Sequence, residues 1–263
     1  MDRIDALVAH VDQPGIDREP ALDIVRLAPE VTQDEALAVQ LAVKRRRVAE
    51  GDRIVGHQAS FTSAAVQKAF PGAPVPMVGT LLASLLRTSG DLIEIGQDPT
   101  VLECEIGCVL KRDLAGPDLN PTEVLGAIEG FCPVVEVAPV RPGVREGQYS
   151  WPHMIAVQKA AGGYVVVGPR LTSPVRFDPR LEGCLVSVDG APRAGAIGFE
   201  AMGNPLTVIA AVAAKLHRVG ERLRAGQLVI TGSLPAPQPV GPDDRTATAE
   251  FTTLGAVTLR FRR

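Results

Sequence analysis

The sequence lacks an apolar stretch long enough to cross a membrane. A membrane helix needs about 18 to 20 apolar residues in a row, whereas the apolar run from Thr207 to Ala214 ends at Lys215. The first residues, Met1 to Asp5, also lack the basic and then apolar order of a signal peptide. We therefore expect no membrane association and a location in the cytoplasm.

Positive charge is not in excess either. The chain has 27 Lys and Arg residues against 30 Asp and Glu residues, a net charge of −3 at pH 7. A surface that binds nucleic acid displaces phosphate counterions and normally leaves a basic excess. The one dense basic run, Lys44 to Arg47, is interpreted as the solvent-exposed face of a helix. The composition thus predicts no nucleic-acid partner.

Aromatic residues and paired cysteines are also scarce. Aromatic residues make up 4% of the 263 residues and hydrophobic residues 46%, so Val, Leu, Ile and Ala must fill a large core. The four cysteines form no Cys-x-x-Cys pair. Cys104 and Cys108 have a spacing that would suit metal ligands on a helix, but the residues around them are typical of a strand. Buried reduced thiols are the simpler interpretation.

Capping residues predict where the helices begin. Thr32 and Glu35 form a capping box, in which the hydroxyl and the carboxylate bind free backbone N–H groups, and this helix is expected to run to Gly51. Its buried face should carry Leu37, Leu41 and Val48. Three more helices are expected: one after Thr62-Ser63 that ends near Ala69, one after Asn120-Pro121 and one after Asn204-Pro205.

Short strands separated by turns are expected for most of the remaining chain. A strand from Arg53 is expected to end in a glycine turn at Gly56. Further strand candidates are residues 101–110, 134–137, 164–167, 183–188, 228–231 and 257–261. The expected architecture is a helical start packed against a mixed, mostly β body.

Three glutamates stand out against these strands. Strand side chains alternate between faces, so Glu103 and Glu105 project from the face opposite to Cys104 and its apolar neighbours. The two acids repel each other unless something lies between them, although an edge strand that faces water explains them as well. Glu136 interrupts an apolar run, and a buried carboxylate must be paired, protonated or bound to a cation. Three carboxylates on adjacent strands would suit a hard divalent ion such as Mg²⁺ or Mn²⁺.

Short motifs along nearly the whole chain link it to a known family. They are residues 56–63 (GHQASFTS), Glu103-Cys104-Glu105, the helix 121–130 that leads to Glu136, and residues 203–206 (GNPL), 225–233 (AGQLVITGS) and 254–257 (LGAV). Each is weak alone, but their order and spacing are specific. The chain resembles the fumarylacetoacetate hydrolase superfamily, within it the branch of 2-keto-4-pentenoate hydratases and 4-oxalocrotonate decarboxylases.

This resemblance implies an α+β fold, with a mixed β-roll or sandwich body and an N-terminal helical portion. We expect the helical portion in residues 1–60 and the β-roll catalytic domain in residues 61–263. The resemblance also implies that Glu103, Glu105 and Glu136 hold a divalent metal, Mg²⁺ or Mn²⁺. In such enzymes the metal binds the 2-oxo acid end of a small substrate and stabilises an enolate. Enzymes of this kind are homo-oligomers, so a homo-oligomer is expected.

The sequence departs from the family pattern where protons are handled. Gln58 stands where the family usually has a Lys, and it is a catalytic candidate by position, although an amide is neither acid nor base near neutral pH. His57 beside it titrates near working pH and could transfer protons instead. Lys159 could also do so, because it stands where the family carries a polar Asp-Asn pair. The alternatives are a structural His57 and a solvent-exposed Lys159.

Candidates for substrate binding lie in three further places. Arg141 remains from the family's Asp-Ser-Arg stretch and could clamp a substrate carboxylate, or lie on the surface. Ser84 stands in a loop that usually offers an acid. Gly232 and Ser233 follow a strand and could offer an N–H group and a hydroxyl to an anion, or form an ordinary polar turn.

The sequence therefore predicts a divalent-metal-dependent lyase for a small 2-oxo or 2-hydroxydienoic acid, of the hydratase or decarboxylase type. Both reactions need the same enolate, so the sequence leaves the choice between them open. The replaced Lys and acids leave two alternatives. One is a repurposed tautomerase or carbon-carbon hydrolase on the same scaffold, and the other is a catalytically weak structural partner in a hetero-oligomer.

Overall fold

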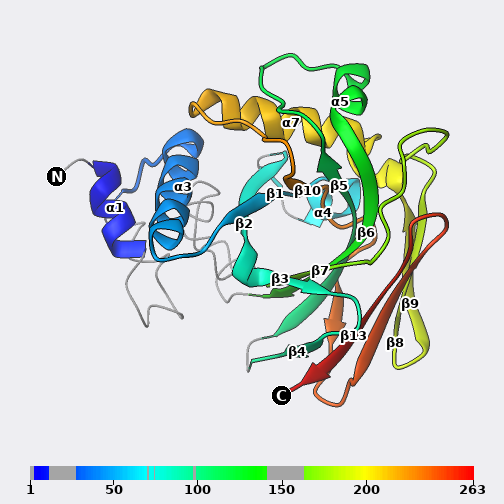
Figure 1. Cartoon of the computed structure of the whole chain (residues 1–263). Helices are drawn as coiled ribbons and strands as arrows, with labels where there is room; N and C mark the ends of the chain where they lie inside the picture. The colour runs from blue at the N-terminus through cyan, green and yellow to red at the C-terminus, as the bar shows by residue number, and fades with distance from the viewer. Residues whose placement is uncertain (1–2, 12–27, 70, 74, 97–98, 141–162) are drawn as a thin grey trace.

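Two β-sheets form the body of the protein, and helices lie against the larger one (Figure 1). The computed structural model describes residues 3–11, 28–69, 71–73, 75–96, 99–140 and 163–263. The strands of the larger sheet are β1 (Ile54–Ser60), β2 (Met77–Leu82), β3 (Leu86–Thr88), β5 (Thr100–Leu110), β6 (Ile128–Pro139), β7 (Tyr164–Val167), β10 (Leu228–Ile230) and β11 (Gln238–Val240). The smaller sheet contains β4 (Leu92–Glu94), β8 (Gly183–Val188), β9 (Ala191–Ile197), β12 (Thr246–Phe251) and β13 (Gly255–Arg262). The helices are α1 (Arg3–Val11), α3 (Gln33–Ala49), α4 (Ala64–Ala69), α5 (Pro121–Ala127) and α7 (Pro205–Arg218), with short 3₁₀ turns η1 (Ala83–Leu85) and η2 (Gly198–Glu200).

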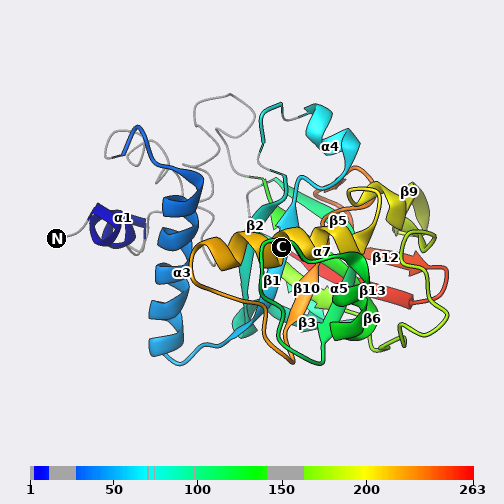
Figure 2. The same cartoon turned by 90° about the horizontal axis from the view of Figure 1, so that it is seen from above.

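The strand order makes this a mixed β-roll with helices on its outside. The larger sheet runs β2-β1-β10-β5-β6-β7-β3, with β11 also paired to β5, and the smaller runs β4-β13-β12-β8-β9. Seen from above, α7 crosses β1 and β10, α3 stands beside the end of α7, and α1 lies beyond α3 (Figure 2). The expected α+β class, with a β body and N-terminal helices, is confirmed.

The helices begin where their capping residues predict. Thr32 and Glu35 bind each other's backbone N–H groups at the start of α3. Asn120 and Glu123 do the same at α5, and the Asn204 side chain accepts a hydrogen bond at the start of α7. Because these caps satisfy backbone donors that are otherwise free, local sequence determines the helix starts.

Of two predictions about α3, one is wrong and the other holds only in part. The basic run is predicted to face solvent, yet Lys44 is only 2% exposed, whereas Arg45-Arg46 are exposed. Val48 is predicted to be buried with Leu37 and Leu41, yet it is 40% exposed. Residues three and seven positions apart share a helix face, so Lys44 packs on the same side as the two leucines. The packed face of the helix ends before its last turn.

β1 runs further than the sequence predicts. It continues to Ser60 and pairs with both β2 and β10, so there is no turn at Gly56. A Cβ at Gly56 would lie 1.8 Å from the Leu228 carbonyl oxygen. The glycine is therefore needed for the close approach of β10. β1, which the expected division places with the N-terminal helices, is a strand of the large sheet.

The two faces of the larger sheet have different surroundings. Pairing registers put one set of side chains on a single face, which we call the inner face. Its members are Gln58, Gly79, Leu81, Glu103, Glu105, Gly107, Cys132, Val134, Glu136, Val165, Leu228 and Ile230. The opposite, outer face packs in the main core with α7 and the smaller sheet. The inner face is lined by a separate apolar cluster, interrupted by the three glutamates and Gln58.

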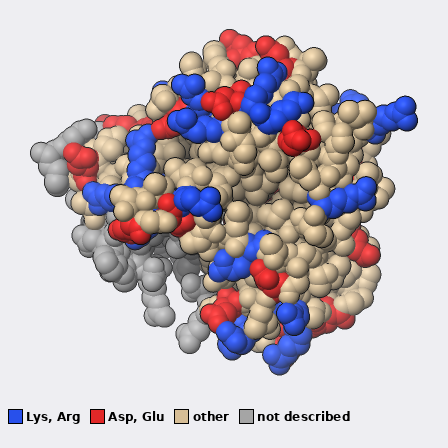
Figure 3. Space-filling view, viewed as in Figure 1, with Lys and Arg blue, Asp and Glu red and all other residues tan. Residues whose placement is uncertain are grey.

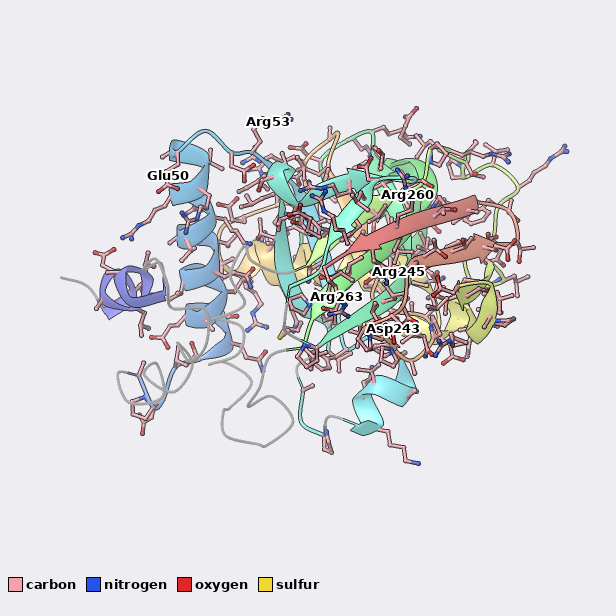
Figure 4. The ribbon with its side chains drawn as sticks, turned by 90° about the horizontal axis from the view of Figure 1, so that it is seen from below. Glu50, Arg53, Asp243, Arg245, Arg260 and Arg263 are labelled. Atoms are coloured by element: carbon pink, nitrogen blue, oxygen red, sulfur yellow. The ribbon has the colours of Figure 1, made fainter. Side chains whose placement is uncertain are left out.

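Among the described residues, several charged side chains make structural contacts and the cysteines are buried. On the face shown in Figure 3, basic and acidic side chains are interspersed. Arg260 on β13 donates to the Gly90 carbonyl, and Arg263, directly after β13, donates to the carbonyls of Val240 and Gly241 at the end of β11 (Figure 4). All four cysteines are buried and free of disulfides, as predicted. Among the described helices, none has the length and apolar character to span a membrane.

Candidate metal centre

The three predicted glutamates come together on the inner face. β5 and β6 are antiparallel, and Glu103 stands directly opposite Glu136 in their pairing. Glu105 is two residues further along β5, on the same side of the sheet. One carboxylate oxygen from each of the three lies within 4.8 Å of the other two. Strand alternation supplies the shared face, and the β5–β6 register brings in the third acid.

The arrangement is electrostatically unfavourable without a cation. Glu105 is 1% exposed and Glu136 6% exposed. Burial raises the pKa of all three carboxyl groups above the usual range, and repulsion from neighbouring glutamates raises the pKa of Glu105 and Glu136 further. Two buried acids and the half-buried Glu103, so close together, must share protons or a positive charge.

The residues present fit a hard divalent ion. All three donors are carboxylate oxygens, the ligand type that Mg²⁺ and Mn²⁺ prefer. Oxygen ligands of one Mg²⁺ ion lie about 2.1 Å from it, hence about 3 to 4 Å from one another, which agrees with the spacing within 4.8 Å. Three protein ligands leave further coordination positions for water or substrate.

We expect metal affinity to rise with pH. The raised pKa values mean that the metal-free folded protein holds protons on these carboxyls above the ordinary glutamate pKa of 4.5. A cation must displace those protons, so Mn²⁺ should bind more weakly at pH 6 than at pH 8.5. Titration calorimetry in two buffers of different ionisation enthalpy would measure both the affinity and the released protons. Binding that neither releases protons nor depends on pH would contradict this.

Gln58 lies on the inner face beside the three glutamates, as its position in β1 requires. It pairs with Ile230 on one side and Gly79 on the other, and a Cβ at Gly79 would lie 2.7 Å from the Gln58 Cγ. Its amide N–H group donates to Glu136, which partly offsets the rise in the pKa of that carboxyl. Gln58 therefore orients a candidate metal ligand, in a place where the sequence resemblance leads one to expect a proton-transfer group.

His57 lies on the opposite side of β1 from Gln58, because neighbouring strand residues face opposite ways. The structure does not bring it to the glutamates. It is 3% exposed, opposite Thr80 on β2, and its Nδ1 has no hydrogen-bond partner among the residues that the structure describes. Burial lowers the pKa of His57 to about 4, and the nearby Lys44 lowers it as well, despite a hydrogen bond to the Gly79 backbone. His57 is thus a neutral core histidine between the sheet and α3.

This burial predicts a loss of stability in acid. With a pKa of about 4 in the folded state and 6.5 when unfolded, His57 takes up its proton more readily in the unfolded chain between these values. The part of the unfolding free energy that depends on His57 has its full value above pH 6.5 and falls by about 3 kcal/mol as the pH drops to 4. Urea unfolding of wild type and His57→Gln at several pH values would isolate this effect from the glutamates. A constant difference in unfolding free energy between pH 7.5 and pH 4.5 would contradict the assignment.

The turn that carries Gly232 and Ser233 lies against β5, beside the glutamates. The Gly232 N–H group donates to the Glu105 carboxylate at 2.7 Å, and the Ser233 hydroxyl donates to the Pro235 carbonyl at 2.8 Å. The structure brings these residues to the site, with their polar groups engaged inside the protein. Their predicted contact with a substrate carboxylate stays a prediction.

Ser84 is not brought to the cluster. It is exposed in η1, and its hydroxyl and backbone N–H group both donate to the Asp52 carboxylate. The hydrogen bond from the Ser84 hydroxyl is the main cause of the lowered pKa of Asp52. Arg141 and Lys159 lie outside the described residues, so their predicted roles rest on the sequence alone.

Sequence reasoning missed one residue of this region, Thr62, which it treats only as a helix cap. The Thr62 side chain is 2% exposed, and its hydroxyl donates to the Thr231 carbonyl at 2.8 Å, 169 residues away. In the structure Ser63, and not Thr62, accepts from the first turn of α4, through the Val66 N–H group. Its place in the motif GHQASFTS was the available signal.

Comparison with known proteins places this geometry in context. A model described as "Fumarylacetoacetate (FAA) hydrolase C-terminal" matches residues 48–262. A TodF product hydratase from Pseudomonas putida is 32% identical over 240 residues, which cover 90% of this chain and 87% of the relative. A 4-oxalocrotonate decarboxylase from Pseudomonas putida is 27% identical over 262 residues, 99% of this chain and 97% of the relative.

A solved structure resembles the whole chain. The 4-oxalocrotonate decarboxylase from Pseudomonas putida G7, complexed with magnesium and adipate, superimposes with a TM-score of 0.86 at 27% identity. The match covers 99% of this chain and 97% of that one. The 2-hydroxyhepta-2,4-diene-1,7-dioate isomerase from Mycobacterium marinum has a TM-score of 0.61 at 17% identity, a likeness of fold alone.

Proposed function

The chain belongs to the fumarylacetoacetate hydrolase family, and on this premise we propose that it is a divalent-metal-dependent lyase for a small 2-oxo or 2-hydroxydienoic acid. The observation that carries the proposal is the buried convergence of Glu103, Glu105 and Glu136 on the inner face. Hydratases and decarboxylases among the relatives, and the magnesium in the solved decarboxylase, support it. Mg²⁺ or Mn²⁺ is the proposed ion.

Each part of the inner face has a task in this proposal. A bound cation supplies Lewis-acid stabilisation for negative charge that develops on the 2-oxo group of the substrate. The three glutamates hold the cation, and the Gln58 amide orients Glu136. The apolar side chains around them keep bulk water away, which strengthens the charge interactions at the site. Gln58 exchanges no proton near neutral pH, so another group must transfer protons, and Lys159 is proposed first. Arg141 is proposed to hold the substrate carboxylate.

Turnover assays with and without Mg²⁺ test the function. The substrates are 2-hydroxypenta-2,4-dienoate, for water addition, and 4-oxalocrotonate, for release of CO₂. Metal-dependent turnover of either supports a lyase and tells a hydratase from a decarboxylase. Ketonisation or carbon-carbon hydrolysis without either reaction would identify the repurposed enzyme. No turnover by a protein that binds metal would favour the structural partner, although the relatives favour neither alternative.

We further propose a homo-oligomer that works in the cytoplasm without a nucleic-acid or membrane partner. The family resemblance and the apolar composition of 46% support self-association. Light scattering at several concentrations measures the mass directly. A constant mass near the 27.7 kDa of one chain would contradict the oligomer.

A further inference from the structure

One peptide group beside the candidate metal centre is hydrogen-bonded at both ends. It joins Thr231 to Gly232. Its N–H group donates to the Glu105 Oε2 at 2.7 Å, and its carbonyl oxygen accepts from the Thr62 hydroxyl at 2.8 Å. All the groups involved are buried. A continuous chain of two hydrogen bonds therefore leads from Thr62 through this peptide group to Glu105.

The backbone on both sides of this peptide group is fixed. The Thr231 hydroxyl donates to the Ile106 carbonyl at 2.9 Å, and the Leu234 N–H group donates to the Cys104 carbonyl at 2.9 Å. These contacts fix the turn to β5 on either side of Glu105. The remaining freedom is the tilt of the 231–232 peptide plane, and the Thr62 hydroxyl restrains that tilt.

Thr62 reaches this position through a strained turn. The chain leaves β1 at Ser60, and Phe61 then has a positive φ of 61°, which non-glycine residues rarely adopt. The Gln67 amide donates to the Phe61 carbonyl at 3.0 Å, and the Met202 N–H group donates to the Thr62 carbonyl at 3.0 Å. Contacts from α4 and from the segment before α7 thus hold Thr62 in place. Strain that is held in this way is typical of functional positions.

Only glycine fits at the other end of the contact. Gly232 has a φ of +87°, and a Cβ there would lie 2.1 Å from the Thr62 Oγ1. The absence of a side chain allows the Thr62 hydroxyl to approach the peptide group closely. Thr62 and Gly232 therefore fit each other at this contact.

We propose that Thr62 is a positioning residue for the metal centre, acting through the 231–232 peptide group on Glu105. This inference rests on the proposed function, in which Glu105 is a metal ligand. A hydrogen bond to a carbonyl polarises the peptide group and strengthens the bond that its N–H group donates. Thr62 thus orients one Glu105 oxygen and leaves the other for the cation. Partners that orient metal ligands typically change metal affinity by 10- to 100-fold.

The experiment measures Mn²⁺ binding to the full-length protein by electron paramagnetic resonance. Thr62→Val keeps the shape but removes the donor, and should weaken Mn²⁺ binding about 10-fold and alter the spectrum of the bound ion. Thr62→Ser keeps the hydroxyl that donates to the Thr231 carbonyl, so it should bind Mn²⁺ within about twofold of wild type. Thr80→Val is the matched control. Thr80 is another buried threonine, on β2, and its hydroxyl has no hydrogen-bond partner in the described part of the chain, so this variant should bind Mn²⁺ as wild type does.

The outcomes separate the positioning role from the metal site itself. Wild-type affinity and spectrum for Thr62→Val, with binding weakened at least about 100-fold in Glu105→Gln, would overturn the positioning role and leave the metal centre intact. No Mn²⁺ binding by wild type would instead overturn the proposed function. Equal weakening in Thr62→Val and Thr62→Ser would show that packing, and not the hydroxyl, matters, which also overturns the inference. If Thr62→Val does not fold, Thr62→Ala removes the donor without a bulky apolar group and gives the same test.

Discussion

Replacing Glu105 by Gln should weaken Mn²⁺ binding by at least about 100-fold, and turnover should fall with it. Glu105 is the most buried of the three acids, accepts a hydrogen bond from the Gly232 N–H group, and has a carboxylate oxygen within 4.8 Å of the other two acids. An amide has nearly the same shape but no charge, so two acids would have to hold the cation. Loss of a proposed direct ligand should exceed the 10- to 100-fold effect that is typical of losing a partner that only orients a ligand. Calorimetric titration with Mn²⁺ and steady-state kinetics measure the two effects.

The same substitution should stabilise the metal-free protein. A carboxyl whose pKa is raised on folding favours the folded state most below its unfolded pKa of 4.5, and this contribution is lost as the pH rises through the folded pKa. The glutamine amide does not ionise, so Glu105→Gln does not lose stability in this way as the pH rises. The unfolding free energy of the variant should therefore exceed that of wild type by an amount that grows from pH 5 to pH 8 in EDTA. Glu129→Gln, an exposed acid on β6, is the control and should change neither property. A variant that is destabilised without metal and binds Mn²⁺ normally would disprove the metal centre.

Removing the amine of Lys159 should lower turnover by at least about 10²-fold, because general acid-base groups contribute about 10² to 10⁴-fold. The structure argues against two of the three candidates for the proton-transfer group, Gln58 and His57. Gln58 does not titrate and is bonded to Glu136, while His57 is buried on the other face of β1 with a pKa near 4. Lys159 stands in the sequence where the family carries polar residues of its site. A lysine beside a cation would also have a lowered pKa, which suits proton transfer.

The test uses Lys159→Met, which keeps the length of the side chain without the charge. Turnover should fall while Mn²⁺ affinity stays within about twofold of wild type, since acid-base groups need not be ligands. Lys111→Met, an exposed lysine after β5, serves as the control. Gln58→Lys should not raise turnover, because its ammonium group would pair with Glu136. Full turnover by Lys159→Met would leave water at the metal centre as the better assignment.

The helix starts could be read from the sequence because capping is a local interaction. Thr32 with Glu35 and Asn120 with Glu123 satisfy backbone groups within four residues of themselves. The alternation along β5 is also local, and it places Glu103 and Glu105 on one face in any strand. These features need no knowledge of what packs against the element.

The predictions about Lys44 and Gly56 were wrong because contacts with distant segments of the chain determine the structure at both residues. Lys44 lies on the same face of α3 as Leu37, and its burial depends on the elements that pack against α3, which include α1 and β2 and are not encoded in α3 itself. Gly56 resembles a turn residue, but the close approach of Leu228, 172 positions later, requires glycine inside the strand. In both cases the local pattern is compatible with two structures.

By itself the sequence determined the helix caps, the shared face of Glu103 and Glu105, and the family. Only the tertiary structure decided that Glu136 stands opposite Glu103, that His57 faces away from Gln58's side of the sheet, and that Thr62 reaches Glu105 through a peptide group. Strand register and loop packing join residues far apart in the chain. A centre built from β1, β5, β6 and the turn after β10 therefore forms only when those strands are assembled.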